Sequence, residues 1–202
     1  MNSECPLPGS VGATSRSRPG PRMKRVLVPL APGFEEIEAI TVIDILRRAG
    51  IEVIVAGTVP GPITASRQTK HLPDCLLADV AGDDFDLIVL PGGLPGTTNL
   101  RQDPHIAALL KRRRPIAAIC AAPTILAAYG LLAGKTATSH PSVRDEIRQV
   151  AGTVSEERVV VDGDLITSQA AGTAMEFAFR LVEYLCSPAK VAEVNQGVCA
   201  RL

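Results

Sequence analysis

The sequence predicts an α/β protein in which helices pack around a mostly parallel sheet. Short apolar runs, of the kind that fill strands buried on both faces, recur at Val26–Leu30, Ile51–Ala56 and Ile116–Ile119. Segments with apolar residues at helical spacing alternate with these runs, and Gly and Pro punctuate the boundaries. Because a strand, a helix and a second strand in succession give parallel neighbours, we expect a single α/β domain over residues 23–202.

Composition excludes several classes of function. The chain has 202 residues, with Lys plus Arg and Asp plus Glu balanced at 21 each, so no net field draws it to nucleic acid or anionic membranes. Aromatic residues make up only 3%, which argues against base stacking. The longest apolar runs are too short to span a bilayer. We therefore expect no membrane partner and no specific nucleic-acid binding.

Residues 1–22 are expected to form a disordered N-terminal extension. They are rich in Pro, Gly, Ser and Arg and hold few apolar residues, so they cannot offset the entropy of ordering. They contain no hydrophobic segment typical of a secretory signal. Because Met23 begins a sequence typical of a first strand, we interpret the extension as an over-long reading frame.

The cysteines and histidines predict neither disulfides nor a metal. An odd number of five cysteines, without close spacing, is neither a disulfide framework nor a CxxC pair. A reducing, cytoplasmic location fits this pattern. The three histidines form no cluster with ligand spacing, so we predict no metal and no cofactor. The positions are Cys5, Cys75, Cys120, Cys186, Cys199, His71, His105 and His140.

The first half of the predicted domain begins with a strand–helix–strand unit. After the strand Val26–Leu30, the segment Phe34–Ala49 has acidic residues in its first turns, basic residues in its last, and Gly50 at its end, as helices prefer. The second strand is Ile51–Ala56. The less regular stretch that follows contains Ile63–Thr69, which we expect to be a strand of a small hairpin.

The second half continues the alternation. A run of basic residues ends one of its helices and is interpreted as a solvated helix C-terminus. An Asp-Gly pair marks a hairpin turn. The predicted elements are a strand at Asp86–Leu90, a helix at Pro104–Arg114, a strand at Ile116–Ile119, a helix from Pro123 to Gly130, a strand at Thr136–Ser139, a helix at Val143–Val150, a hairpin at Val159–Thr167, a helix at Gly172–Cys186, and one or two further turns at Pro188–Asn195.

Cys120 lies in the sharp turn between a buried strand and a helix that begins at Pro123. A side chain on such a turn points outward at the carboxyl end of the sheet, where open α/β folds bind ligands. The helix N-terminus would lower the pKa of the thiol and enrich the nucleophilic thiolate. The alternative is an inert, buried thiol, since free cysteines are often core residues.

Two further strand ends carry polar or flexible residues that should converge on Cys120. Acidic residues follow the first strand at Glu35–Glu38, and Gly92 and Gly93 follow Leu90. If the thiolate attacks a carbonyl, the N–H groups of Gly93 and Ala121 are suited to stabilise the oxyanion. A carboxylate beside a thiolate would repel it, so one of the two groups should hold a proton that can be shuttled on the substrate.

These residues resemble the ThiJ/PfpI superfamily, and most closely its branch containing the parkinsonism-associated protein deglycase and bacterial YajL. The resemblance extends in order from Lys24 to Ala192. It implies a flavodoxin-like three-layer sandwich of the class I glutamine amidotransferase type, usually a homodimer. The motifs are Lys24-Arg-Val-Leu-Val28, Gly33-Phe-Glu-Glu-Ile-Glu38, Arg47-Arg-Ala-Gly50, Val89-Leu-Pro-Gly-Gly93, Ala118-Ile-Cys-Ala-Ala-Pro-Thr124 and Thr138-Ser-His-Pro141.

The resemblance also implies roles for individual residues. It makes Cys120 the oxidation-prone nucleophile and Glu38 the protonated carboxyl that hydrogen-bonds it. The other residues implied are Gly93 and Ala121 as oxyanion donors, His140 as a nearby histidine, and Arg48 and Arg67 as basic residues near the pocket and dimer interface. The implied activities are cofactor-free glyoxalase action on methylglyoxal, deglycation of proteins or nucleotides, and a redox-linked chaperone function.

The sequence departs from the family pattern at several positions. Ala121 stands where the peptidase branch has a histidine, which argues against proteolysis. Ala122 replaces a glycine and would narrow the turn. Gln169-Ala170-Ala171 stands where the branch often has Arg-Gly-Pro, which would alter the pocket rim, and Leu72 replaces a cysteine near the dimer interface of some relatives.

Three functional hypotheses follow. In the first, an enzyme uses Cys120 and Glu38 to convert a 2-oxoaldehyde, or its early adduct on a protein or nucleotide, into a 2-hydroxy acid. In the second, the same thiol oxidises and makes the protein a stress sensor or redox chaperone. The third, an amidase or peptidase, requires His140 within hydrogen-bond reach of Cys120.

Overall fold

The computed structural model, which describes residues 22–112 and 115–202, contains a seven-stranded sheet. Its strand order is β10-β11-β7-β6-β1-β2-β5, and every neighbouring pair is parallel except β10 with β11. The predicted mostly parallel α/β sheet is confirmed. Its strands are β1 (Arg25–Leu30), β2 (Glu52–Gly57), β5 (Cys75–Leu76), β6 (Leu87–Leu90), β7 (Ile116–Ile119), β10 (Val159–Asp162) and β11 (Leu165–Ser168).

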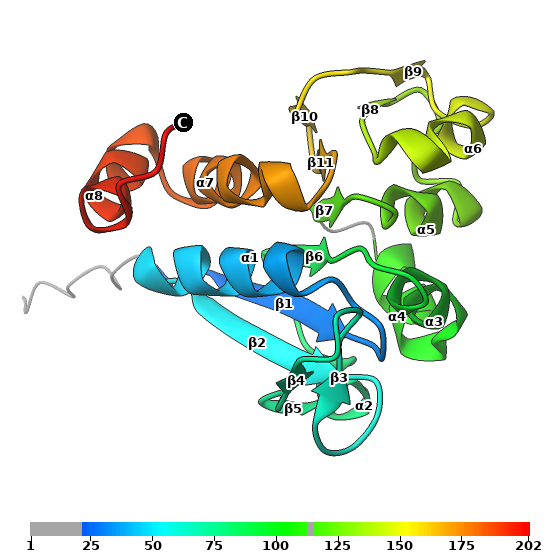
Figure 1. The fold of residues 1–202 in the computed structure, drawn as a ribbon, viewed down its shortest axis with the longest axis horizontal. Helices are drawn as coiled ribbons and strands as arrows, with labels where there is room; N and C mark the ends of the chain where they lie inside the picture. The colour runs from blue at the N-terminus through cyan, green and yellow to red at the C-terminus, as the bar shows by residue number, and fades with distance from the viewer. Residues whose placement is uncertain (1–21, 113–114) are drawn as a thin grey trace, which may run out of the picture.

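Helices cover both faces of the sheet and give the predicted three-layer sandwich. On one face α1 (Glu36–Arg48) packs alongside α7 (Ala174–Leu185), which contacts α8 (Pro188–Val198), as Figure 1 shows. The other face is covered by α3 (Gly96–Gln102), α4 (Pro104–Lys111), α5 (Pro123–Ala128) and α6 (Arg144–Arg148). The central strands are buried between the layers: all four residues of β6 and of β7 are buried, as their apolar runs predicted.

Several short elements escaped the sequence analysis. They are the edge strand β5, the helices α2 (Leu77–Val80) and α3, and the strand β9 (Thr153–Val154), which pairs with β8 (Thr136–Ala137). The expected strand at Ile63–Thr69 is instead β3 (Ile63–Thr64) and the turn that joins it to β4 (Lys70–His71). Elements of two to four residues are too short to show a hydrophobic period, and the seven residues of α3 include only one large apolar side chain, Leu100, so pairing and packing decide these elements.

Helix ends also differ from the predicted ones for local reasons. The last helix, α8, runs for 11 residues because Ser187 caps its N-terminus and accepts a hydrogen bond from the Lys190 N–H. The segment Pro141–Val143 forms a 3₁₀ turn before α6, and Ala171–Thr173 forms another before α7. Asp86, placed in a strand by the sequence analysis, instead accepts a hydrogen bond from the Arg25 N–H at 2.9 Å.

The carboxyl ends of four adjacent parallel strands lie at one edge of the sheet. The chain crosses from β1 to β2 on one side and later returns to place β6 on the other side of β1. Open α/β sheets bind ligands where the strand order reverses in this way. The loops that follow β1, β6, β7 and β11 therefore meet at the expected position of a site.

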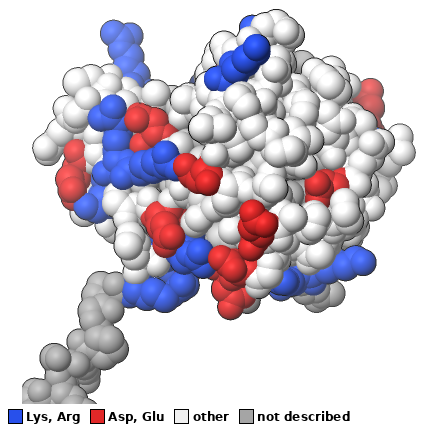
Figure 2. All heavy atoms as spheres, turned by 90° about the horizontal axis from the view of Figure 1, so that it is seen from below, with Lys and Arg blue, Asp and Glu red and all other residues white. Residues whose placement is uncertain are grey.

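The expected disordered extension lies outside the described residues, apart from Arg22, whose guanidinium contacts Asp86 at 2.8 Å. The last two residues of the predicted basic helix end, 113 and 114, also lie outside them. On the face shown in Figure 2, acidic and basic side chains lie interspersed over the surface. Within the described ranges, no helix has the length and apolar character needed to cross a membrane.

Candidate active site

Cys120 lies directly between the end of β7 and the first turns of α5, where its backbone is left-handed, with φ of 65°. For a residue other than glycine this conformation costs about 1–2 kcal/mol. Two hydrogen bonds hold the peptide there: the Cys120 N–H donates to the Ser168 carbonyl at 3.0 Å, and the His140 N–H donates to the Cys120 carbonyl at 2.9 Å. The turn directs the half-buried side chain into a pocket at the sheet edge.

Glu38, in the first turn of α1, is 1% exposed and extends beneath Cys120. Its Oε2 accepts a hydrogen bond from the Gly92 N–H at 2.9 Å. A Cβ on Gly92 would lie 2.6 Å from this oxygen and 2.7 Å from Cys120 Cβ, so a side chain at position 92 would separate the two groups. The other oxygen, Oε1, has no hydrogen-bond partner in the described part of the chain, and the carboxyl as a whole interacts with the Cys120 thiol.

The carboxyl and the thiol control each other's ionisation. Burial raises the pKa of Glu38 to about 7, while its hydrogen bond with Cys120 opposes the rise. Burial, followed by the charge and hydrogen bond of Glu38, raises the pKa of Cys120 to about 12. When Glu38 is protonated, the repulsion disappears and the carboxyl becomes a donor to the sulfur. Because the pKa of Glu38 is the lower of the two, the carboxyl is the group that titrates around neutral pH, and the thiol keeps its proton while Glu38 is ionised.

The expected lowering of the thiol pKa by the helix N-terminus is therefore wrong. The helix α5 has only six residues, so the electrostatic effect of its N-terminus is small. Burial of the thiol and the nearby charge of Glu38 raise the pKa of Cys120 by more than the helix lowers it. Two backbone groups do act in the expected direction, because the N–H groups of Ala121 and Gly93 hydrogen-bond to the sulfur and lower its pKa. Gly93 has φ of 93°, and a Cβ there would lie 2.5 Å from the Glu35 nitrogen, so this approach requires glycine.

The three glutamates of Glu35–Glu38 contact three different partners. Glu35 caps α1, its Oε2 accepting from the Glu38 N–H at 2.8 Å. Glu36 accepts from the Ser66 hydroxyl, the Arg67 N–H and the Thr69 hydroxyl, and so fixes the β3–β4 turn against α1. Of the three, Glu38 is the one that hydrogen-bonds Cys120. The three carboxylates are close in the sequence, but only that of Glu38 is fully buried, and this burial gives it a different role.

The pocket around Cys120 has a volume of about 260 Å³. It brings together most of the residues that the sequence nominated, since Cys120, Gly93, Ala121, His140 and Arg67 all line it. His140 Nδ1 faces the Ser142 hydroxyl at 2.7 Å, and no hydrogen bond joins its ring to the Cys120 sulfur within the described residues. The lining residues that sequence reasoning did not select for the pocket are Glu35, Ser66, Leu94 and Ser142.

These additional residues carry little signal in the sequence. Glu35 caps α1, and its position in the pocket follows from where this helix begins. Ser66 and Ser142 enter on short loops whose positions depend on long-range hydrogen bonds, such as that from Ser66 Oγ to Glu36 at 2.9 Å. The sequence analysis gave Gly92 no role of its own beside Gly93, and in the structure its N–H donates a hydrogen bond to Glu38.

Arg48 does not lie in the Cys120 pocket. It stands in the last turn of α1, pairs with Asp44 at 2.7 Å, and lines a different groove of about 600 Å³ between α1, α7 and α8. Arg48 therefore lies outside the Cys120 pocket, because α1 carries it away from the sheet edge, and its implied place at a dimer interface stays a prediction. Arg67 remains at the rim because Glu36 holds its backbone.

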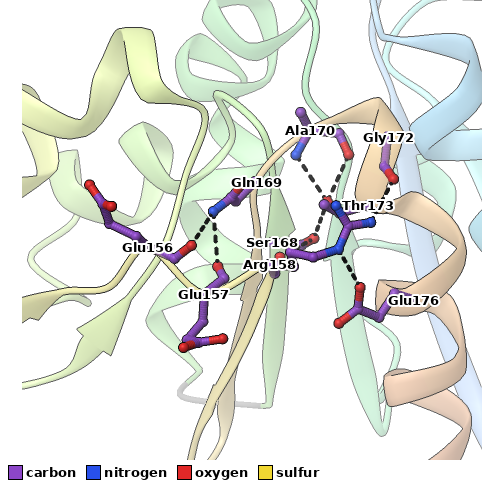
Figure 3. Close-up of polar contacts among 9 residues, drawn as sticks. All are labelled: Glu156, Glu157, Arg158, Ser168, Gln169, Ala170, Gly172, Thr173 and Glu176. Atoms are coloured by element: carbon purple, nitrogen blue, oxygen red, sulfur yellow. Dashed lines mark hydrogen bonds and ion pairs between the residues drawn. The ribbon is translucent and has the colours of Figure 1, made fainter. Parts of the chain in front are cut away.

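The departures from the family pattern fit the fold locally. Ala122 is fully buried in right-handed helical geometry, with φ of −62°, so its methyl group needs no unusual backbone. Gln169 donates from Nε2 to the carbonyls of Glu156 and Glu157 and ties the segment before β10 to the end of β11, as Figure 3 shows. Leu72 is 74% exposed. Among the described residues, no His, Cys, Asp or Glu cluster is suited to a metal ion.

Fold and site together define a class of α/β proteins. In this class a cysteine occupies a strained strand–turn–helix junction, beside a buried carboxyl and two convergent backbone N–H groups.

Comparison with known proteins identifies the family. The sequence pattern of the DJ-1/PfpI family matches residues 24–184, and the chain belongs to this family. It is 43% identical over 181 residues to Parkinson disease protein 7 homolog of Danio rerio, covering 85% of this chain and 95% of that protein. It is 38% identical over 181 residues to glutathione-independent glyoxalase DJR-1.2 of Caenorhabditis elegans, covering 87% of this chain and 96% of that protein.

The crystal structure of Drosophila melanogaster DJ-1beta superposes with a TM-score of 0.87 at 45% identity, covering 90% of this chain and all of that one. The family and branch indicated by the motifs, and the flavodoxin-like architecture that they implied, are thereby confirmed.

The raised pKa of Glu38 predicts an unusual dependence of stability on pH. A carboxyl with a folded pKa of about 7 and an ordinary value of 4.5 binds its proton more tightly in the folded state. Its contribution to stability is present below pH 4.5 and is lost as the pH rises towards 7. Across this window the free energy of unfolding of the wild-type protein should fall by up to about 3 kcal/mol, at about 1.4 kcal/mol per pKa unit. Urea unfolding should show that this fall is absent in Glu38→Gln.

Glu36→Gln is the matched control because the pKa of Glu36 is lowered by its hydrogen bonds, against the effect of burial. Its contribution has the opposite sign, being lost as the pH falls through the carboxylate's ordinary range. Glu36→Gln should therefore lower stability near neutrality and leave the slope above pH 4.5 intact. Equal slopes for wild type and Glu38→Gln would contradict the assignment of a protonated Glu38.

Proposed function

We propose that this protein is a cofactor-independent glyoxalase and deglycase that acts on 2-oxoaldehydes of the methylglyoxal type, or on their early adducts on proteins and nucleotides. The observation that carries the proposal is the convergence on Cys120 Sγ of a protonatable carboxyl, Glu38, and two N–H donors, Gly93 and Ala121. The name of the Caenorhabditis elegans relative, a glutathione-independent glyoxalase, supports the same class of reaction.

In the first step the Cys120 thiolate adds to the aldehyde carbon. The C–S bond forms as the carbonyl π pair moves onto oxygen, where the N–H groups of Gly93 and Ala121 stabilise the developing charge. Glu38, protonated beside the thiolate, gives its proton to that oxygen. The product is a hemithioacetal, and Glu38 is left as a carboxylate placed to act as a base.

In the second step Glu38 removes the proton from the former aldehyde carbon, and the electron pair forms a carbon–carbon double bond while the neighbouring carbonyl becomes the oxyanion of an enediolate. Glu38 returns this proton to the neighbouring carbon, and the hydroxyl proton of the hemithioacetal passes to the neighbouring oxygen, which gives a thioester of a 2-hydroxy acid. One carbon is thus oxidised and the other reduced without an external redox partner. Water then attacks the thioester, the C–S bond breaks, and the acid leaves as the thiol is restored. The pocket volume of about 260 Å³ suits a small aldehyde.

The enzyme proposal predicts that conversion of methylglyoxal to lactate depends on both partners of the buried pair. Without glutathione or added metal, Cys120→Ser should abolish turnover, and Glu38→Gln should lower it by about a hundredfold or more, the scale of a lost general acid–base. Cys186→Ser, on an exposed thiol, and Glu36→Gln should keep most of the activity. Lactate measured by enzymatic assay decides the matter: unchanged turnover in Cys120→Ser would overturn the mechanism.

A second proposal uses the same thiol as an oxidative-stress sensor or redox chaperone. Cys120 is half-buried in an open pocket, and a protonated Glu38 can hydrogen-bond the oxygens of a sulfinic acid. Peptide mass spectrometry after mild peroxide should find Cys120 oxidised well before the other four cysteines, Cys5, Cys75, Cys186 and Cys199, with altered binding of unfolded clients. Equal oxidation of all five thiols, without a change in client binding, would exclude a sensor centred on Cys120.

The amidase or peptidase hypothesis has the weakest support. A Cys–His pair requires the imidazole to accept the thiol proton. His140 Nδ1 is instead engaged with Ser142, at 2.7 Å from its hydroxyl and 3.2 Å from its N–H. We therefore assign His140 to the pocket wall and to the hydrogen bond that its backbone makes with Cys120.

We also propose that residues 23–202 act as one cytoplasmic domain that associates as a homodimer through the groove lined by Arg48. The solvent-facing side of α1 carries Ile37 and Ile40, which are 56% and 38% exposed, and Met175 and Val198 extend the same apolar groove. Burial of such a patch against a second copy would remove apolar surface from water.

Ile40→Glu should convert a dimer into a monomer in analytical ultracentrifugation, because burying an unpaired charge in an apolar contact is costly. The control, Val150→Glu, changes a similarly exposed apolar residue outside this groove and should leave the mass unchanged. A wild-type protein that sediments as a monomer at micromolar concentration would refute the dimer.

A further inference from the structure

The strained peptide of Cys120 depends on an anchor outside the pocket. One of its two backbone hydrogen bonds runs to the Ser168 carbonyl, at the last residue of β11. This bond continues the β7–β11 ladder one residue beyond the Ile119–Ser168 pair. The direction of that carbonyl therefore fixes where β7 ends and where the left-handed turn begins.

Ser168 is in turn fixed by a pair of buried hydroxyls. Its Oγ donates to the Arg158 carbonyl at 2.9 Å and lies 2.6 Å from Thr173 Oγ1. The Thr173 hydroxyl also contacts Ala170, whose N–H and carbonyl lie 3.1 and 2.8 Å away. Figure 3 shows the two hydroxyls at the centre of this network, between the start of β10, the end of β11 and the beginning of α7.

The burial of the pair makes its geometry demanding. Ser168 is 0% and Thr173 3% exposed, so water cannot replace a lost partner. The two hydroxyls carry one proton each and have three acceptors within reach, namely the Arg158 carbonyl, the Ala170 carbonyl and each other, so neither proton is left without a partner. An outer clamp surrounds it, in which the Arg158 guanidinium binds Glu176 at 2.7 Å and the Gly172 carbonyl at 2.9 Å. This clamp is exposed to solvent and touches neither hydroxyl.

We infer that Ser168 and Thr173 are positioning residues for Cys120: their hydroxyl pair sets the Ser168 carbonyl that holds the Cys120 peptide in its left-handed turn. This inference rests on the proposed function for its effect on turnover, but not for its effect on the thiol itself. If the anchor loosens, the Cys120 backbone relaxes, and the sulfur moves away from the N–H groups of Gly93 and Ala121 that favour the thiolate. A purely structural role would instead lower stability without changing the reactivity of Cys120 in the folded protein.

The test is the rate of Cys120 alkylation by iodoacetamide, resolved by peptide mass spectrometry in the full-length protein. Thr173→Val keeps the shape and removes the hydroxyl. It should slow alkylation of Cys120 by roughly ten- to a hundredfold, the scale expected when a reacting group is misplaced by a fraction of an ångström or more. Exposed Cys186 in the same sample should react at its wild-type rate.

Three matched variants separate positioning from stability. Thr173→Ser retains the hydroxyl and should restore alkylation to within about twofold of wild type, whereas Ser168→Ala should reproduce the slow reaction of Thr173→Val. Glu176→Gln weakens only the outer clamp and should lower the melting temperature slightly without slowing Cys120. Wild-type alkylation in folded Thr173→Val or Ser168→Ala would overturn the inference, as would an equal loss in Glu176→Gln.

Measuring lactate formation from methylglyoxal in the same samples distinguishes this inference from the proposed function. If alkylation slows as expected while wild-type protein makes no lactate, the positioning role stands and the enzymatic proposal fails. If wild-type turnover depends on Cys120 but Thr173→Val alkylates and turns over normally, the proposed function stands and the positioning role fails.

Discussion

The structure of the site depends on burying one carboxyl against one thiol. Glu38 is 1% exposed, and an unpaired carboxylate at such a position is costly. Among the described residues, the Gly92 N–H donates to one of its oxygens, the other oxygen has no hydrogen-bond partner, and the carboxyl interacts with the Cys120 thiol. The rise of its pKa to about 7 follows from this poor solvation. The close approach requires glycine at position 92 and a left-handed backbone at Cys120, so each unusual feature of the site follows from the same contact.

Much of the fold could be predicted because its determinants are local. Four-residue apolar strands such as Leu87–Leu90 and Ile116–Ile119 are buried on both faces and therefore carry no polar residues. The helix Glu36–Arg48 has its acidic, apolar and basic residues where helix physics favours them. The two-residue strand Cys75–Leu76 is different, because it exists only by pairing with Ala56 and Gly57 of β2, and a dipeptide has no pattern to recognise.

The residues of the site that follow directly after strands could be predicted from the sequence, and those on other segments could not. Cys120, Gly93 and Glu38 meet because parallel strands bring their following loops together, which sequence order alone indicates. Arg48 and Arg67 looked equivalent in the sequence, yet only Arg67 reaches the pocket. Its hairpin is pinned by the Glu36 carboxylate, a contact between residues 31 positions apart. The thiol pKa was predicted in the wrong direction because the helix dipole was considered and the cost of burial was not.

The raised thiol pKa does not make Cys120 inert, because the group that raises it can reverse its effect. With Glu38 ionised, charge and hydrogen bonding both oppose the thiolate; with Glu38 protonated, the same oxygen donates to the sulfur. The reactive form is thus the one in which Glu38 is protonated and Cys120 is a thiolate. The N–H groups of Gly93 and Ala121 favour this form further. An electrophile that accepts a proton as it bonds to sulfur, such as an aldehyde, converts Glu38 directly into the base needed next. In the proposed mechanism a peroxide makes no such second use of the carboxylate, which is the physical difference between the two proposed uses of Cys120.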